Sequence, residues 1–189
     1  MATSTRDRLI AGMRDSLRAR GFGSTSMKEL LAATGVSSGS MYHSFPGGKD
    51  ELAAATVREA GFKGAELIRG VFAKTASVSE GIELIFRDLM RDLEQSSFAN
   101  GCPIGVPATE AVGVSVRISD AAREVFDAWV AAYRDALVHD GWPTAEATAF
   151  ATLIVTAYEG SLTVARAVRR LDAIHNAMTY LTARAANGA

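Results

Sequence analysis

The stretch STSMKELLAATGVSSGSMYHSFPGGKDEL, residues 24–52, decides the fold of this chain. Ser26 and Glu29 form the pattern of a capping box, in which Ser26 accepts from the amide of Glu29 and Glu29 reaches back to the amide of Ser26. Gly35 favours the left-handed conformation that ends a helix, and Ser37 offers an N-cap for another. The sequence therefore predicts two short helices joined by a tight turn.

The second of these helices combines an apolar face with a polar one. Met41 and Phe45 are four residues apart, with Val36 nearby, so we expect them to point into a core. The other faces carry hydroxyl, phenol and imidazole groups, on Ser38, Ser40, Tyr42, His43 and Ser44. Such groups donate to or accept from phosphates and base edges.

A preceding helix completes a DNA-binding arrangement. Leu9, Met13 and Leu17 recur every four residues before a stop at Gly21. Three helices in this order, with a tight turn between the last two, form a helix-turn-helix. In that motif the second helix of the pair lies in the DNA major groove, so the serine-rich helix is predicted to read DNA.

The charge distribution agrees with a DNA-binding N-terminus. The formal net charge of −1 argues against a surface covered with nucleic-acid-binding charge. Before Lys49, however, six basic residues stand against three acidic ones.

The one cysteine, Cys102, cannot form an internal disulfide, so we expect a cytoplasmic protein. Cys102 itself is either a small apolar core residue or a redox sensor.

The rest of the chain also shows helical spacing, and no segment alternates with the period of two expected of a strand. We expect a long helix from Lys49 towards Lys74 and further helices with N-caps at Ser79, Ser119 and Thr144. The fold class is therefore all-α, with about nine helices.

This pattern divides into two domains. We place a three-helix helix-turn-helix DNA-binding domain at residues 1–48 and a larger helical ligand-binding and dimerisation domain at residues 49–189. We expect dimerisation through the last two helices, because two helices from each subunit can pack as a four-helix interface in a two-fold symmetric dimer.

Other classes of protein are not favoured. The N-terminal segment mixes acids with arginines, so we expect no signal peptide. We find no apolar run approaching the roughly 18 residues that span a bilayer. Gly47-Gly48-Lys49 lacks the upstream glycine of a phosphate-binding loop. The three histidines have no partner at metal-ligand spacing, so we expect neither metal, cofactor nor enzyme activity.

Residues 24–52 are very similar to the DNA-binding domain of TetR-type transcriptional repressors. The resemblance joins a capped helix, a Gly-Val turn, the recognition helix GSMYH and a lysine that leads the next helix. FPGGKDEL (45–52), GCPIG (101–105) and EGSLTVARA (159–167) resemble the LmrA/YxaF-like branch of that family. In such proteins the equivalents of Tyr42 and Lys49 commonly touch phosphates, and the positions matching Ser38, Ser40 and His43 lie near the groove floor. Ser38 departs from the family, which often has a basic residue there.

The resemblance and the polar pattern together give a set of candidate DNA contacts, Ser26, Ser37, Ser38, Ser40, Tyr42, His43 and Lys49. Each has a simpler alternative. His43 is otherwise a surface histidine, and Tyr42 is otherwise half-buried packing. Lys49 is otherwise a solvated lysine, although a cation in the first turn of a helix is unfavourable unless an anion lies nearby.

Aromatic residues at helical spacing mark a candidate ligand site in the larger domain. The set comprises Phe126, Trp129, Tyr133, Tyr158 and Glu159. Tryptophan and tyrosine carry polar groups that need partners when buried, and they commonly line cavities. The alternatives are that the aromatic residues are simply core and that Glu159 pairs with Arg166.

These features favour a ligand-responsive transcriptional repressor that binds a pseudo-palindromic operator as a homodimer. Its effector is expected to be a small, mainly apolar or aromatic molecule. The alternative is an all-helical small-molecule-binding or scaffold protein without specific DNA binding.

Overall fold

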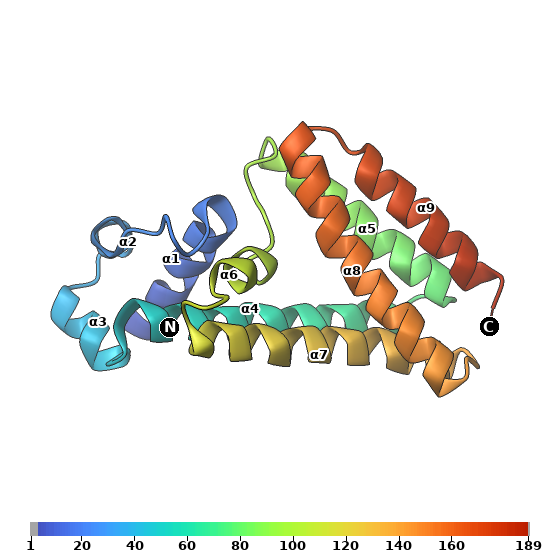
Figure 1. The fold of residues 1–189 in the computed structure, drawn as a ribbon, viewed down its shortest axis with the longest axis horizontal. Helices are drawn as coiled ribbons and strands as arrows, with labels where there is room; N and C mark the ends of the chain where they lie inside the picture. The colour runs from blue at the N-terminus through green and yellow to red at the C-terminus, as the bar shows by residue number, and fades with distance from the viewer. Residues whose placement is uncertain (1–3, 189) are drawn as a thin grey trace. The chain divides into compact units, whose positions relative to one another are not determined.

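The computed structural model describes residues 4–188, and over this range the chain forms nine α-helices and no strand (Figure 1). The all-α prediction is confirmed. The helices are α1 (Thr5–Arg20), α2 (Met27–Thr34), α3 (Ser38–Ser44), α4 (Gly48–Phe72), α5 (Val78–Gln95), α6 (Gly105–Glu110), α7 (Val116–His139), α8 (Thr144–Val168) and α9 (Asp172–Ala186).

The chain divides into two compact units, and their limits do not follow a boundary at residue 48. The first unit comprises the chain up to Gly61 together with Cys102–Val125, and the second comprises Phe62–Gly101 and the chain from Phe126 onwards. The difference arises because α4 is one unbroken helix of 25 residues. In addition, α6, which was not expected from the sequence, packs against α1.

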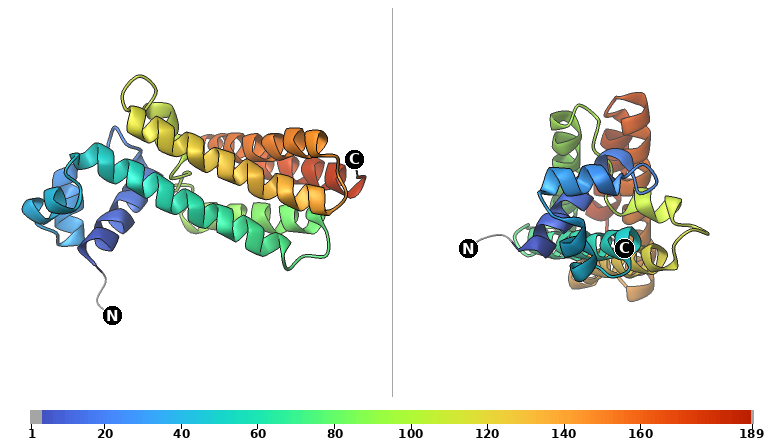
Figure 2. Two further views of the ribbon diagram at one scale, coloured as in Figure 1. Left: turned by 90° about the horizontal axis from the view of Figure 1, so that it is seen from below. Right: turned by 90° about the vertical axis from the view of Figure 1, so that its left-hand side faces the viewer.

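The first unit is built around the inner faces of its N-terminal helices. α1 packs against both α2 and α3. Its core contains the expected apolar stripe of α1, the apolar face of α3 and one leucine of α4. The fully buried side chains are Leu9, Met13, Leu17, Met41, Phe45 and Leu52. The right-hand view of Figure 2 looks onto these helices.

The ends of α2 and the start of α3 follow the predicted signals with one exception. Gly35 ends α2 with φ 62°, and the Oγ atoms of Ser26 and Ser37 accept from the amides of Glu29 and Ser40. The second half of the capping box is wrong. The carboxylate of Glu29 instead accepts from Arg20 at 2.7 Å, because the end of α1 brings a guanidinium group within its reach.

The second unit is a helical layer in which α5, α8 and α9 lie side by side (Figure 2). Its buried residues include Ile82, Phe86, Leu93, Ile154 and Ile174. Ser79, on α5, donates to the carbonyl of Thr182 on α9 at 3.0 Å.

Three predicted N-caps were placed wrongly. α5 begins after Ser77, whose Oγ accepts from the amide of Glu80, so Ser79 lies within the helix. The amide of Ile118 donates to the Oγ of Ser115, so the hydroxyl that caps the start of α7 lies four residues before Ser119. α8 begins at Thr144 itself, with no side-chain cap.

One helix of the described residues, α8, is long and apolar enough to cross a membrane by length and composition alone. The expectation that no apolar run is long enough is therefore wrong for α8. Alanine and threonine residues separate its large apolar side chains, which hides the run in the sequence, but they add no charge and leave the mean hydropathy of the helix high. The core helix of a soluble protein meets the same criterion. α8 packs against α9 and α5, but only 33% of its most apolar window is buried.

Candidate nucleic-acid interface

α3 presents a polar surface opposite its buried face. Met41 and Phe45 are buried, and Arg6 lies over the Phe45 ring at 5.4 Å from its centroid. The residues predicted to read DNA lie elsewhere on the helix, where Ser37, Ser38, Ser40, Tyr42 and His43 are exposed and Ser44 is half-buried. The predicted division of α3 into two faces is therefore present.

Two serine hydroxyls of α3 and its N-cap donate hydrogen bonds to Ser40. Ser37 donates to the Oγ of Ser40 at 2.9 Å, and Ser44 donates to the carbonyl of Ser40 at 3.0 Å. A hydroxyl has one proton and two lone pairs. Because its Oγ is used as an acceptor, the proton of Ser40 remains available to an outside acceptor.

Three other side chains of the polar surface are exposed and have no polar partner in the described chain. Within residues 4–188, the side chains of Ser38, Tyr42 and His43 make no hydrogen bond. Tyr42 is 56% exposed, and its ring passes beside Gly48, where a Cβ would stand 3.5 Å from Cε1. That distance is an ordinary van der Waals contact, so it is the φ of 68° at Gly48, and not the nearby ring, that favours glycine there.

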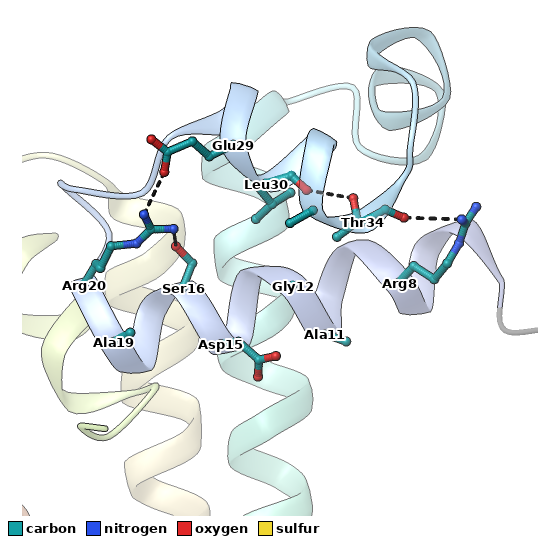
Figure 3. Close-up of a pocket in the computed structure, with 11 residues that line it drawn as sticks. Arg8, Ala11, Gly12, Asp15, Ser16, Ala19, Arg20, Glu29, Leu30 and Thr34 are labelled. Atoms are coloured by element: carbon teal, nitrogen blue, oxygen red, sulfur yellow. Dashed lines mark hydrogen bonds and ion pairs between the residues drawn. The ribbon is translucent and has the colours of Figure 1, made fainter. Parts of the chain in front are cut away.

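Side chains from α1 fix the position of α2 (Figure 3). Arg20 donates both to Glu29 and, at 3.3 Å, to the Oγ of Ser16. Arg8, near the other end of α1, donates to the carbonyl of Thr34 at 3.3 Å. An open groove of about 610 Å³ between α1 and α2 is lined by residues of both helices, among them Gly12 and Leu30. The two arginine contacts hold α2 near its start and at its end, and the second also fixes the turn that leads to α3.

Lys49 follows the first residue of α4, and its side chain is engaged within the first unit. Its Nζ lies 4.4 Å from the centroid of the Phe22 ring, a cation–π distance. Partial burial lowers the pKa of the Lys49 ammonium, and the carboxylate of Glu110 opposes that shift. Ser26, the N-cap residue of α2, is half-buried.

Three of the candidate ligand residues of the second unit, Phe126, Trp129 and Tyr158, form a connected aromatic cluster. Trp129 makes edge-to-face contacts with Phe126 at 5.9 Å and with Tyr158 at 6.1 Å between centroids. Tyr158 continues the cluster to Phe86 at 5.8 Å. Phe86 was not among the predicted residues, since its place in the stripe of α5 indicated only a core position.

Tyr133 lies in a separate contact with Phe72, 5.6 Å between centroids. It is 2% exposed, and burial raises the pKa of its phenol. Glu159 is half-buried with its Oε1 fully covered. Arg166, its suggested partner, donates to the carbonyl of Ala99 at 2.8 Å.

Neither a metal site nor a disulfide is found in the part of the chain that the structure describes. No group of three or more His, Cys, Asp or Glu residues there could hold a metal ion. Cys102 is buried, and its Sγ accepts from the amides of Ile104 and Gly105 at 3.4 and 3.3 Å.

Comparison with known proteins gives two family matches and several relatives. Residues 9–56 match the family described as bacterial regulatory proteins, tetR family, and residues 78–180 match the transcriptional regulator LmrA/YxaF-like C-terminal domain. The uncharacterised HTH-type transcriptional regulator YxaF of Bacillus subtilis is 26% identical over 158 residues, which cover 84% of this chain and 83% of YxaF. An uncharacterised HTH-type transcriptional regulator of Mycobacterium tuberculosis is 29% identical over 185 residues, which cover 93% of each chain.

A solved structure shares the fold. The crystal structure of a TetR transcriptional regulator from Legionella pneumophila superposes with a TM-score of 0.87 at 19% identity, covering 97% of this chain and 98% of that one. The family matches carry the assignment, because the LmrA/YxaF-like match alone spans more than half of the chain. The chain therefore belongs to the TetR family of bacterial DNA-binding transcriptional regulators, in its LmrA/YxaF-like group.

Proposed function

We propose that this protein is a cytoplasmic repressor that binds a pseudo-palindromic operator as a homodimer and is released by a small apolar or aromatic ligand. The observation that carries the proposal is the outer surface of α3. There Ser38, Tyr42 and His43 are exposed and make no hydrogen bond within the described chain. An exposed polar surface of this kind, on the second helix of a helix-turn-helix, suits the floor and walls of a major groove.

The candidate contacts fall into two roles. We assign Ser38, Ser40 and His43 to base edges, because their donors and acceptors face outward along α3. We assign Ser26, Ser37, Tyr42 and Lys49 to phosphates. Phosphate contacts fix the register of a protein on the duplex, whereas base contacts carry sequence information.

An uncharged surface of α8 supports the homodimer. Exposed residues follow this helix at intervals of three or four without a charge among them, namely Ala149, Leu153, Thr156, Gly160, Val164 and Ala167. An added Cβ at Gly160 would meet no heavy atom within 4 Å. Such a surface allows the close approach of a second helix, and α8 and α9 of two subunits would form a four-helix interface.

The aromatic cluster of the second unit supports an apolar or aromatic effector. Phe126 and Tyr158 are only half-buried, on either side of the more deeply buried Trp129. Flat molecules pack well against such rings. An effector that prefers one of two conformations by about 1–3 kcal/mol changes operator affinity roughly 5- to 150-fold.

Selection of bound fragments from random DNA with the full-length protein tests the central proposal. We expect a two-fold symmetric consensus, because a symmetric dimer presents α3 twice. Footprints on that sequence should be symmetric as well. Recovery of unrelated fragments only, bound with the same affinity, would favour a helical binding protein without specific DNA recognition.

A further inference from the structure

A carboxylate from α6 is bound by the turn that joins α1 to α2. Glu110, the last residue of α6, accepts a hydrogen bond from the backbone N–H of Phe22. The same oxygen, Oε2, lies 3.2 Å from the backbone nitrogen of Gly23. The carboxylate fits closely against the chain here, since a Cβ added at Gly21 would stand 2.8 Å from Oε2.

The turn held by Glu110 carries the ring on which Lys49 rests. Phe22 is half-buried, and the Lys49 ammonium lies 4.4 Å from its centroid. Glu110 also acts on Lys49 directly, because its charge favours the ammonium form that burial disfavours. Three residues from separate parts of the sequence thus form one connected cluster of carboxylate, ring and ammonium.

We propose that Glu110 is a positioning residue for DNA binding, which fixes the Phe22 ring and thereby places the Lys49 ammonium at the start of α4. The inference rests on the proposed function, in which Lys49 contacts a phosphate. Glu110 itself need not touch DNA. A lysine has a flexible four-carbon stem and loses rotamer freedom when it binds, so a side chain that is already placed loses less on contact with a phosphate.

A different role for Glu110 would be simple repulsion of DNA by its negative charge, and two conservative variants separate the roles. Glu110→Gln keeps an oxygen that can accept from both amides but removes the charge. Glu110→Asp keeps the charge but is one methylene too short to reach the turn in the same way. Glu110 is exposed, so neither variant opens a cavity in the core.

Operator affinity of the full-length variants gives the first measurement. Positioning predicts that Glu110→Asp weakens binding about three- to tenfold and that Glu110→Gln stays within about twofold of wild type. In a Lys49→Ala background the effect of Glu110→Asp should disappear. The inference would be overturned if Glu110→Gln bound the operator more tightly while Glu110→Asp bound it unchanged. It would also be overturned if Glu110→Asp lost the same affinity in the wild-type and the Lys49→Ala backgrounds.

A second measurement needs no DNA. The Lys49 Nζ lies over the Phe22 ring, so we expect the neighbouring methylene protons to show an upfield ring-current shift in the NMR spectrum, which Phe22→Leu should abolish. Glu110→Asp should reduce this shift and Glu110→Gln should retain it. An unchanged shift in Glu110→Asp would disprove positioning even if the protein binds its operator. Conversely, the expected shifts in a protein without specific DNA binding would leave the positioning intact and remove the proposed function.

Discussion

Gly61 of α4 lies directly against Val125 of α7 in the first unit. A Cβ added at Gly61 would stand 2.8 Å from the Cβ of Val125 and closer still to both of its methyl groups. Distances under 3.0 Å essentially never occur between a Cβ and its neighbours. Both partners are part of helix interiors, so neither backbone can move without displacing a helix. The absence of a side chain at Gly61 is therefore what permits the two helices to approach.

Alanine at two glycines of α4 should have opposite effects on stability. Gly61→Ala should lower the free energy of unfolding by about 1–3 kcal/mol, as overpacking usually does. Gly70→Ala should raise it by up to about 1 kcal/mol, because an added Cβ there meets nothing within 4 Å and alanine is the better helix former. Urea denaturation measures both. Combining Gly61→Ala with Val125→Ala should recover part of the loss, and two strictly additive costs would contradict the packing explanation.

A paired carboxylate in the same unit should make stability depend on pH. Arg58 donates to both oxygens of Glu124, at 2.7 and 3.0 Å, and these hydrogen bonds lower the pKa of the Glu124 carboxyl. Because the folded-state pKa lies below the unfolded one, the stabilisation is present above the unfolded pKa and is lost as the pH falls through the folded value. Both side chains are 38% exposed, so salt should weaken the effect.

Melting curves of wild type and Glu124→Gln from pH 7 down to pH 3 test this dependence. The wild type should melt at the higher temperature at pH 7, and the difference should shrink as the pH falls. Asp15→Asn is the matched control in the same unit, since Asp15 meets Arg14 at 3.4 Å and is 71% exposed. A difference that persists unchanged at pH 3 would show that Glu124 stabilises the fold through something other than its charge.

Base-reading and phosphate-binding residues should differ in what their loss does to DNA recognition. His43→Ala should change the base preference at one position of each half-site, with a loss of about 1–3 kcal/mol on the preferred base. Tyr42→Phe and Lys49→Ala should weaken binding to all sequences alike, and Lys49→Ala should reduce the salt slope by about one. Selection experiments with each variant measure this. An unchanged consensus for His43→Ala would remove His43 from the base-reading set.

Local signals made the helix-turn-helix predictable from the sequence. Ser26 caps the start of α2 and Ser37 the start of α3, each through the amide three residues further on. Gly35 ends α2. All three boundaries lie where the sequence predicted them. The inward face of α3 follows from the four-residue spacing of Met41 and Phe45. Where two serines compete, as Ser77 and Ser79 do, the sequence alone does not decide which one caps the helix, and the prediction chose the wrong one.

Contacts between residues far apart in the sequence could not be predicted in this way. Glu110 reaches Phe22 across 88 positions, and only the packing of α6 on α1 brings the two together. Phe86 joins the aromatic cluster through Tyr158 because α5 and α8 are neighbours in the second unit. Capping and periodicity describe single helices, so they contain no information about which helices meet.

A charge on the exposed surface of α8 should separate the subunits. Leu153 is 53% exposed, and Leu153→Glu would place a carboxylate in the middle of the proposed four-helix interface. Light scattering should report a monomer for this variant. Leu84→Glu on α5 is the matched control, because Leu84 is a leucine of similar exposure outside that surface and should leave the dimer intact. A dimer that survives Leu153→Glu would place the interface elsewhere.

An effector in the aromatic cluster should change the fluorescence of one tryptophan and not of the other. Trp129 belongs to the cluster, whereas Trp142 stacks on Phe150 at 5.2 Å and lies under Arg184. Trp142→Phe keeps a ring in that stack and leaves Trp129 as the single reporter, and Trp129→Phe gives the reverse. Flat apolar compounds that release DNA should quench the first variant over the same concentration range and leave the second unchanged. Release of DNA without any change at Trp129 would exclude this cluster as the effector site, and quenching without release would show a binding site that is not coupled to α3.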